Sequence, residues 1–175
     1  TGSREPASLE LALVGIYDSA DGSYQSFLKH ELKALWPILE RADLLIGFNT
    51  EHFDIPILAK YYTGDLSRIR SVDLLKEVRA TLGRRLKLDT LAEATLGKKK
   101  ISDGMESIRW WKKGEVEKVR KYCLEDVKIT KEIYEYARAN NKLIFKEGGA
   151  LNEIKLDASQ WEEPNENKLT FTLPF

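Results

Sequence analysis

The stretch LLIGFNTEHFD, residues 44–54, passes from an apolar run of strand character into a polar loop. Pro56 follows in the first turn of a helix expected over residues 55–62, where its missing N–H costs nothing. In open α/β sheets, the crevice beyond the carboxyl end of a strand is the usual ligand site. We therefore expect a strand at 44–48 whose end presents Asp54 to a metal ion or a substrate.

Strands and helices alternate on both sides of this stretch. Upstream, LELALVGIY at 9–17 has the pattern of a buried strand, with 24–28 as its hairpin partner. This order of a hairpin followed by alternating strands and helices predicts an α/β fold in which helices flank a mixed sheet. The remaining expected elements are helices at 31–42, at 74–82 capped by Asp73, at 90–96 capped by Asp89, at 105–111 and at 116–139, and strands at 69–72, 142–145 and 169–175.

The composition fits one compact domain, because 175 residues of which 42% are hydrophobic can bury a single substantial core. We expect one domain over residues 1–175, with its core at about 8–146 and a C-terminal extension at 147–175. No stretch approaches the roughly 20 apolar residues of a membrane span, and the N-terminus has no secretory signal. Cys123 is the single cysteine, which excludes an intramolecular disulfide and a thiolate zinc cluster. We expect an intracellular, cytoplasmic protein that does not contact a membrane.

Basic residues are concentrated in the middle of the chain, although the net charge is zero. From Arg84 to Lys121 there are 12 Lys or Arg and 6 Asp or Glu. This excess allows a basic surface for nucleic acid, and it is equally explained by the solvated faces of loops and helices. Lys100, within a run of three lysines, could contact phosphates, and Trp110 could stack on a base. Adjacent helical residues diverge by about 100°, so we expect either Trp110 or Trp111 to belong to the core.

A second candidate site lies in the longest expected helix, where YCLED spans residues 122–126. The i, i+4 spacing places the Tyr122 hydroxyl and the Asp126 carboxylate on one face of that helix. Taken alone, such a pair is commonplace on helices. Asp54 taken alone is also readable as an ordinary helix N-cap, and His52 as a surface residue.

Together the two segments resemble a known family. Asn-x3-Phe-Asp after a strand, with Tyr-x3-Asp about 70 residues later on a helix, resembles the second and third motifs of the DEDD-type 3′-to-5′ exonucleases, in their Tyr subgroup. These enzymes have a ribonuclease H-like fold. The segments at 72–97, 103–114 and 121–137 are similar to exonuclease domains often found as, or beside, helicase-associated proteins. The resemblance covers about residues 9–145 in order.

The resemblance implies a site and a reaction. It implies that Asp54 and Asp126 ligate Mg²⁺ or Mn²⁺ in a two-metal site, that Tyr122 orients the attacking water, and that Asn49 positions the substrate strand or the site loop. Two divalent ions about 4 Å apart can activate water and stabilise the leaving oxygen, and such hard ions prefer carboxylate oxygens. The implied partners are single-stranded DNA or RNA ends and, for some relatives, a helicase. The substrate contacts expected beside Asn49 are Phe53, Lys100 and Trp110.

This chain departs from the family in its first motif. The family's Asp-x-Glu belongs on the first strand, and this tripeptide pattern occurs nowhere in the sequence. Residues 1–3 resemble those that follow that motif, so we expect the chain to begin just after the first strand, although they could also be a cloning remnant. The strand expected at 169–175 could fill the gap in the sheet, but it would bring no carboxylate.

Three functional hypotheses therefore stand side by side. The first is an exonuclease completed by an upstream Asp-x-Glu strand. The second is an inactive ribonuclease H-like module that binds nucleic acid or a helicase-type partner. The third is an α/β interaction scaffold in which Asp54 and Asp126 lie far apart.

Overall fold

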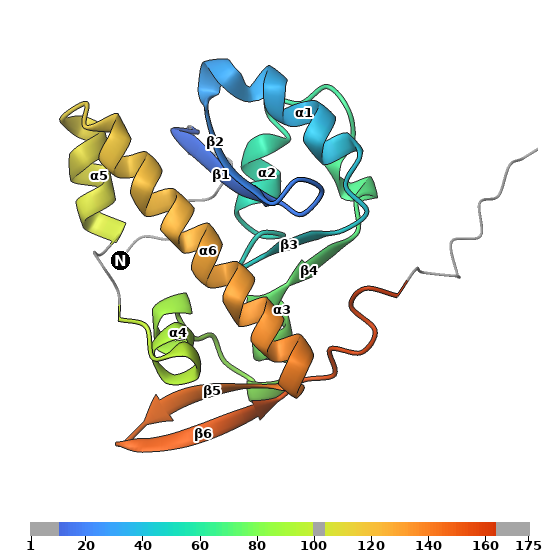
Figure 1. Ribbon diagram of the computed structural model, residues 1–175, viewed down its shortest axis with the longest axis vertical. Coiled ribbons are helices and arrows are strands. Elements are labelled where there is room, and N and C mark those ends of the chain that lie inside the picture. The colour runs from blue at the N-terminus through green and yellow to red at the C-terminus, as the bar shows by residue number, and fades with distance from the viewer. Residues whose placement is uncertain (1–10, 100–103, 164–175) are drawn as a thin grey trace, which may run out of the picture.

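The structure is a computed structural model that describes residues 11–99 and 104–163. Strands and helices alternate along most of the chain, and α6 is the longest element (Figure 1). None of the described helices is long and apolar enough to cross a membrane. The elements are β1 (Leu13–Asp18), β2 (Ser23–Leu28), α1 (Leu32–Glu40), β3 (Leu45–Gly47), α2 (Asp54–Leu58), β4 (Ser71–Asp73), α3 (Leu74–Leu82), α4 (Leu88–Leu96), α5 (Gly104–Lys112), α6 (Val116–Asn140), β5 (Lys142–Glu147) and β6 (Ala150–Lys155), with short 3-10 helices at Lys29–Glu31 and Leu66–Arg68.

The first hairpin pairs β1 with β2 in antiparallel register from Leu13 opposite Leu28 to Asp18 opposite Ser23. Helix α1 buries Leu32, Leu35 and Leu39, which recur at helical spacing and join Phe27 of β2 in one apolar cluster. Burial of this stripe gives α1 its place beside the hairpin.

Strands β3 and β4 run parallel, with Leu45 opposite Ser71 and Gly47 opposite Asp73. Their connection passes through α2, as a parallel pair requires a crossover. Because both strands end at the same edge, the loop after β3 and the start of α3 meet there. This edge carries the candidate site.

Helix α6 crosses both of these sheets, as Figure 1 shows. It packs closely on β1 at Gly15, where a Cβ atom would lie 2.8 Å from Cys123 Sγ, so a larger residue would force the two elements apart. Within the described residues, β1 and β3 do not pair with each other although α6 packs against both. The second apolar cluster lies under the C-terminal half of α6 and includes Ile133 and Leu143, both fully buried.

The last two strands form a hairpin of which only the first strand was expected from the sequence. Strand β5 was expected to end at 145, but it runs to Glu147, turns through Gly148 and Gly149 at positive φ, and returns as β6. Two consecutive glycines are a hairpin signal, since each can adopt φ > 0 without steric cost. The missed strand contributes Ile154, which is 1% exposed in the core.

The α/β class predicted from the sequence is confirmed, and the described strands form three two-stranded sheets with helices around them. Asp73 is confirmed as the N-cap of α3, since its side chain accepts a hydrogen bond from the backbone N–H of Leu75. The prediction for Asp89 is wrong: α4 begins at Leu88 with Lys87 as its N-cap, so Asp89 lies inside the first turn. The strand expected at 169–175 lies outside the described residues.

Candidate functional site

The loop between β3 and α2 is a tight, internally bonded turn. Asn49 has φ 64°, a left-handed conformation that asparagine tolerates better than most residues. The carbonyl of Asn49 accepts from the Phe53 N–H at 3.0 Å, and that of Thr50 accepts from the Ile55 N–H at 3.0 Å. At Gly47 a Cβ atom would lie 1.6 Å from Thr50 Oγ1, so glycine is required for the chain to turn this sharply.

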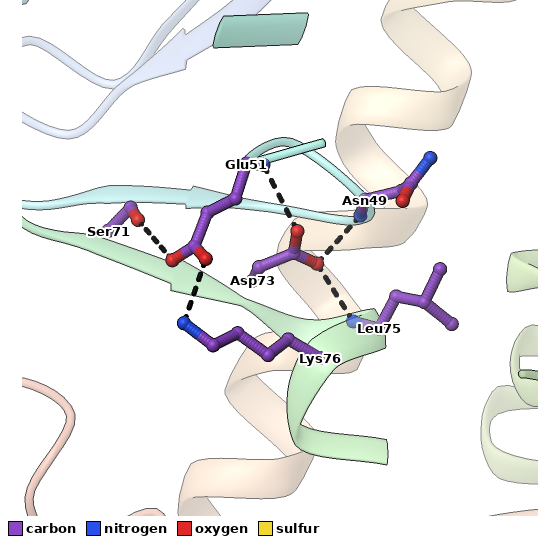
Figure 2. A network of polar contacts seen from close by, with 6 residues as sticks. All are labelled: Asn49, Glu51, Ser71, Asp73, Leu75 and Lys76. Atoms are coloured by element: carbon purple, nitrogen blue, oxygen red, sulfur yellow. Dashed lines mark hydrogen bonds and ion pairs between the residues drawn. The ribbon is translucent and has the colours of Figure 1, made fainter. Parts of the chain in front are cut away.

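A buried carboxylate clamps this loop to the neighbouring strand (Figure 2). Asp73, which is 4% exposed, ends β4 beside the end of β3. Its Oδ1 accepts from the Asn49 N–H at 2.7 Å and the Leu75 N–H at 3.0 Å, and its Oδ2 accepts from the Glu51 N–H at 3.1 Å. One side chain therefore satisfies backbone donors of both the loop and the α3 N-terminus.

Glu51 adds a second tie from the same loop. Its Oε2 accepts from Lys76 Nζ at 2.8 Å and its Oε1 accepts from the Ser71 hydroxyl at 2.7 Å. The hydrogen bond from Lys76, followed by that from Ser71, holds the pKa of the Glu51 carboxyl below its usual value. Glu51 is thus an ionised anchor of the loop.

Asp54 stands immediately after the clamped loop, as the first residue of α2. The N-cap of α2 is Phe53, so Asp54 does not cap the helix in the way that was one reading of the sequence. Desolvation by the surrounding protein, followed by the nearby charge of Asp73, raises the pKa of Asp54 to about 6. Asp54 as a whole residue is exposed, whereas the desolvation of its carboxyl indicates that protein atoms crowd that group.

The thiol of Cys123, in the second candidate segment, is influenced by the charges of both Asp54 and Asp126. Burial raises the pKa of the Cys123 thiol to about 11, with further contributions from the charges of Asp126 and Asp54. Asp126 lies one turn further along α6, whereas Asp54 belongs to α2. Both carboxylates are therefore within electrostatic range of the same sulfur atom, on the side of α6 that packs against β1.

Tyr122 lies about one turn before Asp126 on α6, and Trp110 of α5 packs beside its ring. The Trp110 and Tyr122 rings meet edge to face, with centroids 6.3 Å apart. The expectation that Trp110 or Trp111 belongs to the core is wrong: Trp110 is half-buried against α6 and Trp111 is 40% exposed. Trp110 is therefore placed to restrain the ring of Tyr122.

The other expected site residues lie in different settings. Phe53 is 40% exposed beside Asp54, which leaves its ring available to a ligand. Asn49 directs its side-chain oxygen to Arg85 Nη2 at 3.1 Å. His52 is exposed, and Lys100 lies outside the described residues. From the sequence, Asp73 could be a helix cap or an additional acid recruited by a metal site, and the cap was preferred. The structure confirms the cap and also places Asp73 at the end of the strand parallel to β3, beside the site.

The donor chemistry of this site suits a hard divalent cation. Asp54 and Asp126 both carry carboxylate oxygens, and among the described residues no cationic side chain contributes to the pKa of Asp54, which burial raises to about 6. Over residues 11–99 and 104–163, no three His, Cys, Asp or Glu side chains form a group that could hold a metal ion. The described residues thus offer donors of the type that a hard divalent cation prefers, but they do not by themselves form a complete metal site.

Comparison with known proteins gives one family. A sequence model of the RNase_H superfamily matches residues 4–138, which include both candidate segments. No curated protein and no solved structure matches this chain significantly.

Proposed function

We propose that this chain, which belongs to the RNase H superfamily, is a metal-dependent 3′-to-5′ exonuclease. It would be of the DEDD type, with the Tyr variant of the third motif. Its substrate would be single-stranded ends of DNA or RNA. Membership of the superfamily connects the chain with nuclease and nucleic-acid-related functions, which generally use divalent metal ions. The direction of cleavage and the subgroup rest on the motifs at 49–54 and 122–126.

One observation carries this proposal: Asp54 and Asp126, more than 70 residues apart in the sequence, both act on the thiol of Cys123. Asp54 comes from α2 and Asp126 from α6, so the fold places carboxylates of two distant segments within electrostatic range of one side chain. The like charge that helps to raise the pKa of Asp54 is that of Asp73, and a cation bound at Asp54 would offset it.

Each residue has a defined part in the proposed reaction. Asp54 and Asp126 would hold the divalent metal, whose chemistry when bound would be to activate water and to stabilise the leaving oxygen. Tyr122, restrained by Trp110, orients the attacking water toward the terminal phosphodiester. The exposed ring of Phe53 packs against the terminal nucleotide.

A second candidate function has its own support. Asp-x-Glu is missing from the sequence, and two carboxylates are few for a two-metal site. In this alternative the domain preserves the ribonuclease H-like site region but does not cleave, and it binds nucleic acid or a helicase-type partner.

The test is degradation of a single strand labelled at its 3′ or its 5′ end, with Mg²⁺ or Mn²⁺. The proposed function predicts stepwise loss of 3′ nucleotides that Asp54→Asn and Asp126→Asn each reduce by at least about 100-fold, since each removes a metal ligand. Asp65→Asn is the matched control, because Asp65 is an exposed acid that bonds only within its own turn and to Arg68. This control should retain full activity.

The outcome separates the two candidates. Cleavage that survives both Asp→Asn substitutions would overturn the assigned site. No cleavage by a folded chain that still binds the strand would favour the inactive module.

A further inference from the structure

The segment that follows α3 carries an unusual run of positive charge beside the candidate site. Between Val78 and Leu88 there are four Arg or Lys residues and no Asp or Glu. Helix α3 ends at Leu82, and Gly83 turns the chain with φ 78°. Arg84 and Arg85 follow directly, so two exposed guanidinium groups start from neighbouring backbone positions.

These two arginines have different partners. Arg84 Nη2 pairs with Glu147 Oε1 at 2.5 Å, and its guanidinium also lies 5.6 Å from the centre of the Phe145 ring. Arg85 Nη2 donates to Asn49 Oδ1 at 3.1 Å, and an amide oxygen is neutral. In the part of the chain that the structure describes, no carboxylate forms an ion pair with Arg85, so its charge stays uncompensated.

The hydrogen bond to Asn49 also positions the Arg85 guanidinium beside the site loop. The backbone N–H of Asn49 bonds the buried Asp73, so Arg85 rests on the most firmly held part of the site loop. Asp73 in turn lies within electrostatic range of Asp54. The cation is thus positioned next to the loop that carries the candidate metal ligand.

The chemistry of the Arg85 group suits a phosphate. A guanidinium has five N–H donors in a planar fork that matches phosphate oxygens, and Asn49 uses one of them. Because this side chain is already oriented, less conformational entropy is lost when it binds.

We propose that Arg85 binds a backbone phosphate of the single-stranded nucleic acid, with Asn49 as the residue that positions it. This inference rests on the proposed function, because it needs a strand that approaches Asp54. Arg84, whose charge Glu147 offsets, takes no part in this contact. Comparing substitutions of Arg85 and Arg84 therefore distinguishes a specific phosphate contact from a general effect of positive charge.

The experiment is equilibrium binding of a fluorescent single-stranded oligonucleotide in EDTA, which prevents metal-dependent hydrolysis, over a series of salt concentrations. Arg85→Gln should weaken binding about five- to tenfold at low salt and lower the slope of log K against log salt by about 0.7, as expected for one lost phosphate contact on a single strand. Arg84→Gln removes the same charge and should change affinity less than twofold. Arg85→Lys should keep the salt slope but lose part of the affinity, because an ammonium lacks the planar fork.

The possible results are distinct. Equal losses in Arg85→Gln and Arg84→Gln would overturn the contact and leave the proposed nuclease untouched. Measurable binding that neither variant changes would also overturn it. Failure of the unmutated chain to bind any single strand would overturn this contact together with the proposed function, whereas thermal unfolding of each variant checks that these exposed positions do not alter folding.

Discussion

The loop at 48–53 and helix α5 both border the candidate site, but different forces hold them. The loop is fixed by hydrogen bonds to the buried Asp73 and by the ion pair of Glu51 with Lys76. Helix α5 buries none of its residues, and its apolar side chains include Ile108 at 48% exposed and Met105 at 59% exposed. Hydrogen bonds to one buried carboxylate therefore define the geometry on one side of the site, while α5 depends on its contact with α6.

This contrast bears on what each side can do in the proposed reaction. A metal ligand must be held within a fraction of an ångström, which suits the clamped loop before Asp54. Helix α5 brings Trp110 to the ring of Tyr122 although it buries none of its own residues, so this contact depends on the packing of α5 against α6. Regions with few buried apolar contacts are also those that open most readily.

The largest expected effect comes from breaking the clamp. Asp73→Ala leaves three backbone N–H donors without their acceptor and should lower the free energy of unfolding by roughly 2–4 kcal/mol. Urea denaturation measures this change. Asp65→Ala is the control, because it removes a similar local bond in an exposed turn and should lower the free energy of unfolding much less than Asp73→Ala. Equal losses in the two variants would show that the clamp adds nothing beyond a helix cap.

A smaller effect is expected from Asp54 in the absence of metal. Its pKa is about 6 in the folded state against 3.8 for an ordinary aspartate, so the folded state binds this proton more tightly than the unfolded state. The resulting stabilisation is complete below about pH 4 and is lost as the pH rises to about 6. Asp54→Asn should therefore gain stability relative to the unmutated chain over that window, by about 1 kcal/mol at most because water reaches the residue.

Chemical denaturation at pH 4 and at pH 7 in EDTA tests this expectation for Asp54. A stability difference between the two proteins that does not change with pH would contradict it. Asp65→Asn serves again as the control, because hydrogen bonds from Ser67 lower the pKa of Asp65 and its dependence on pH should have the opposite sign.

The smallest effect is expected on α5. Ile108→Ser should change the free energy of unfolding by no more than about 0.5 kcal/mol, because the side chain is 48% exposed. Ile133→Ser, at a position 0% exposed in α6, should cost more than about 3 kcal/mol, since it leaves a cavity and buries a hydroxyl. A large loss from Ile108→Ser in thermal or urea unfolding would mean that α5 is held as firmly as the core.

Periodic patterns in the sequence were enough to place most elements. The stripe of α6 and the strand before Asp54 were found within a few residues of their observed ends. Strand β6 was missed because its sequence, ALNEIK, carries only two large apolar residues and pairs through a Gly-Gly turn. Its burial of Ile154 depends on the other strand of the hairpin, which a local pattern does not contain.

For the candidate site too, the sequence predicts some features and not others. The residue types and spacing at 49–54 and 122–126 identify which side chains could carry metal chemistry, because such motifs are local. These local motifs do not predict the contacts between distant segments. Such contacts are the hydrogen bond of the Asn49 N–H to Asp73, that of Arg85 to Asn49, and the electrostatic effect of Asp54 on Cys123.

The sequence by itself therefore determined the α/β class, the order of the elements and the two acidic motifs, since each depends on residues close together in the chain. The tertiary structure was needed to learn which carboxylate is buried as a clamp and which of the two neighbouring arginines has a carboxylate partner among the described residues. Burial and ion pairing are set by neighbours that arrive from distant segments: Asp73 meets Asn49 across 24 positions, and Arg84 meets Glu147 across 63.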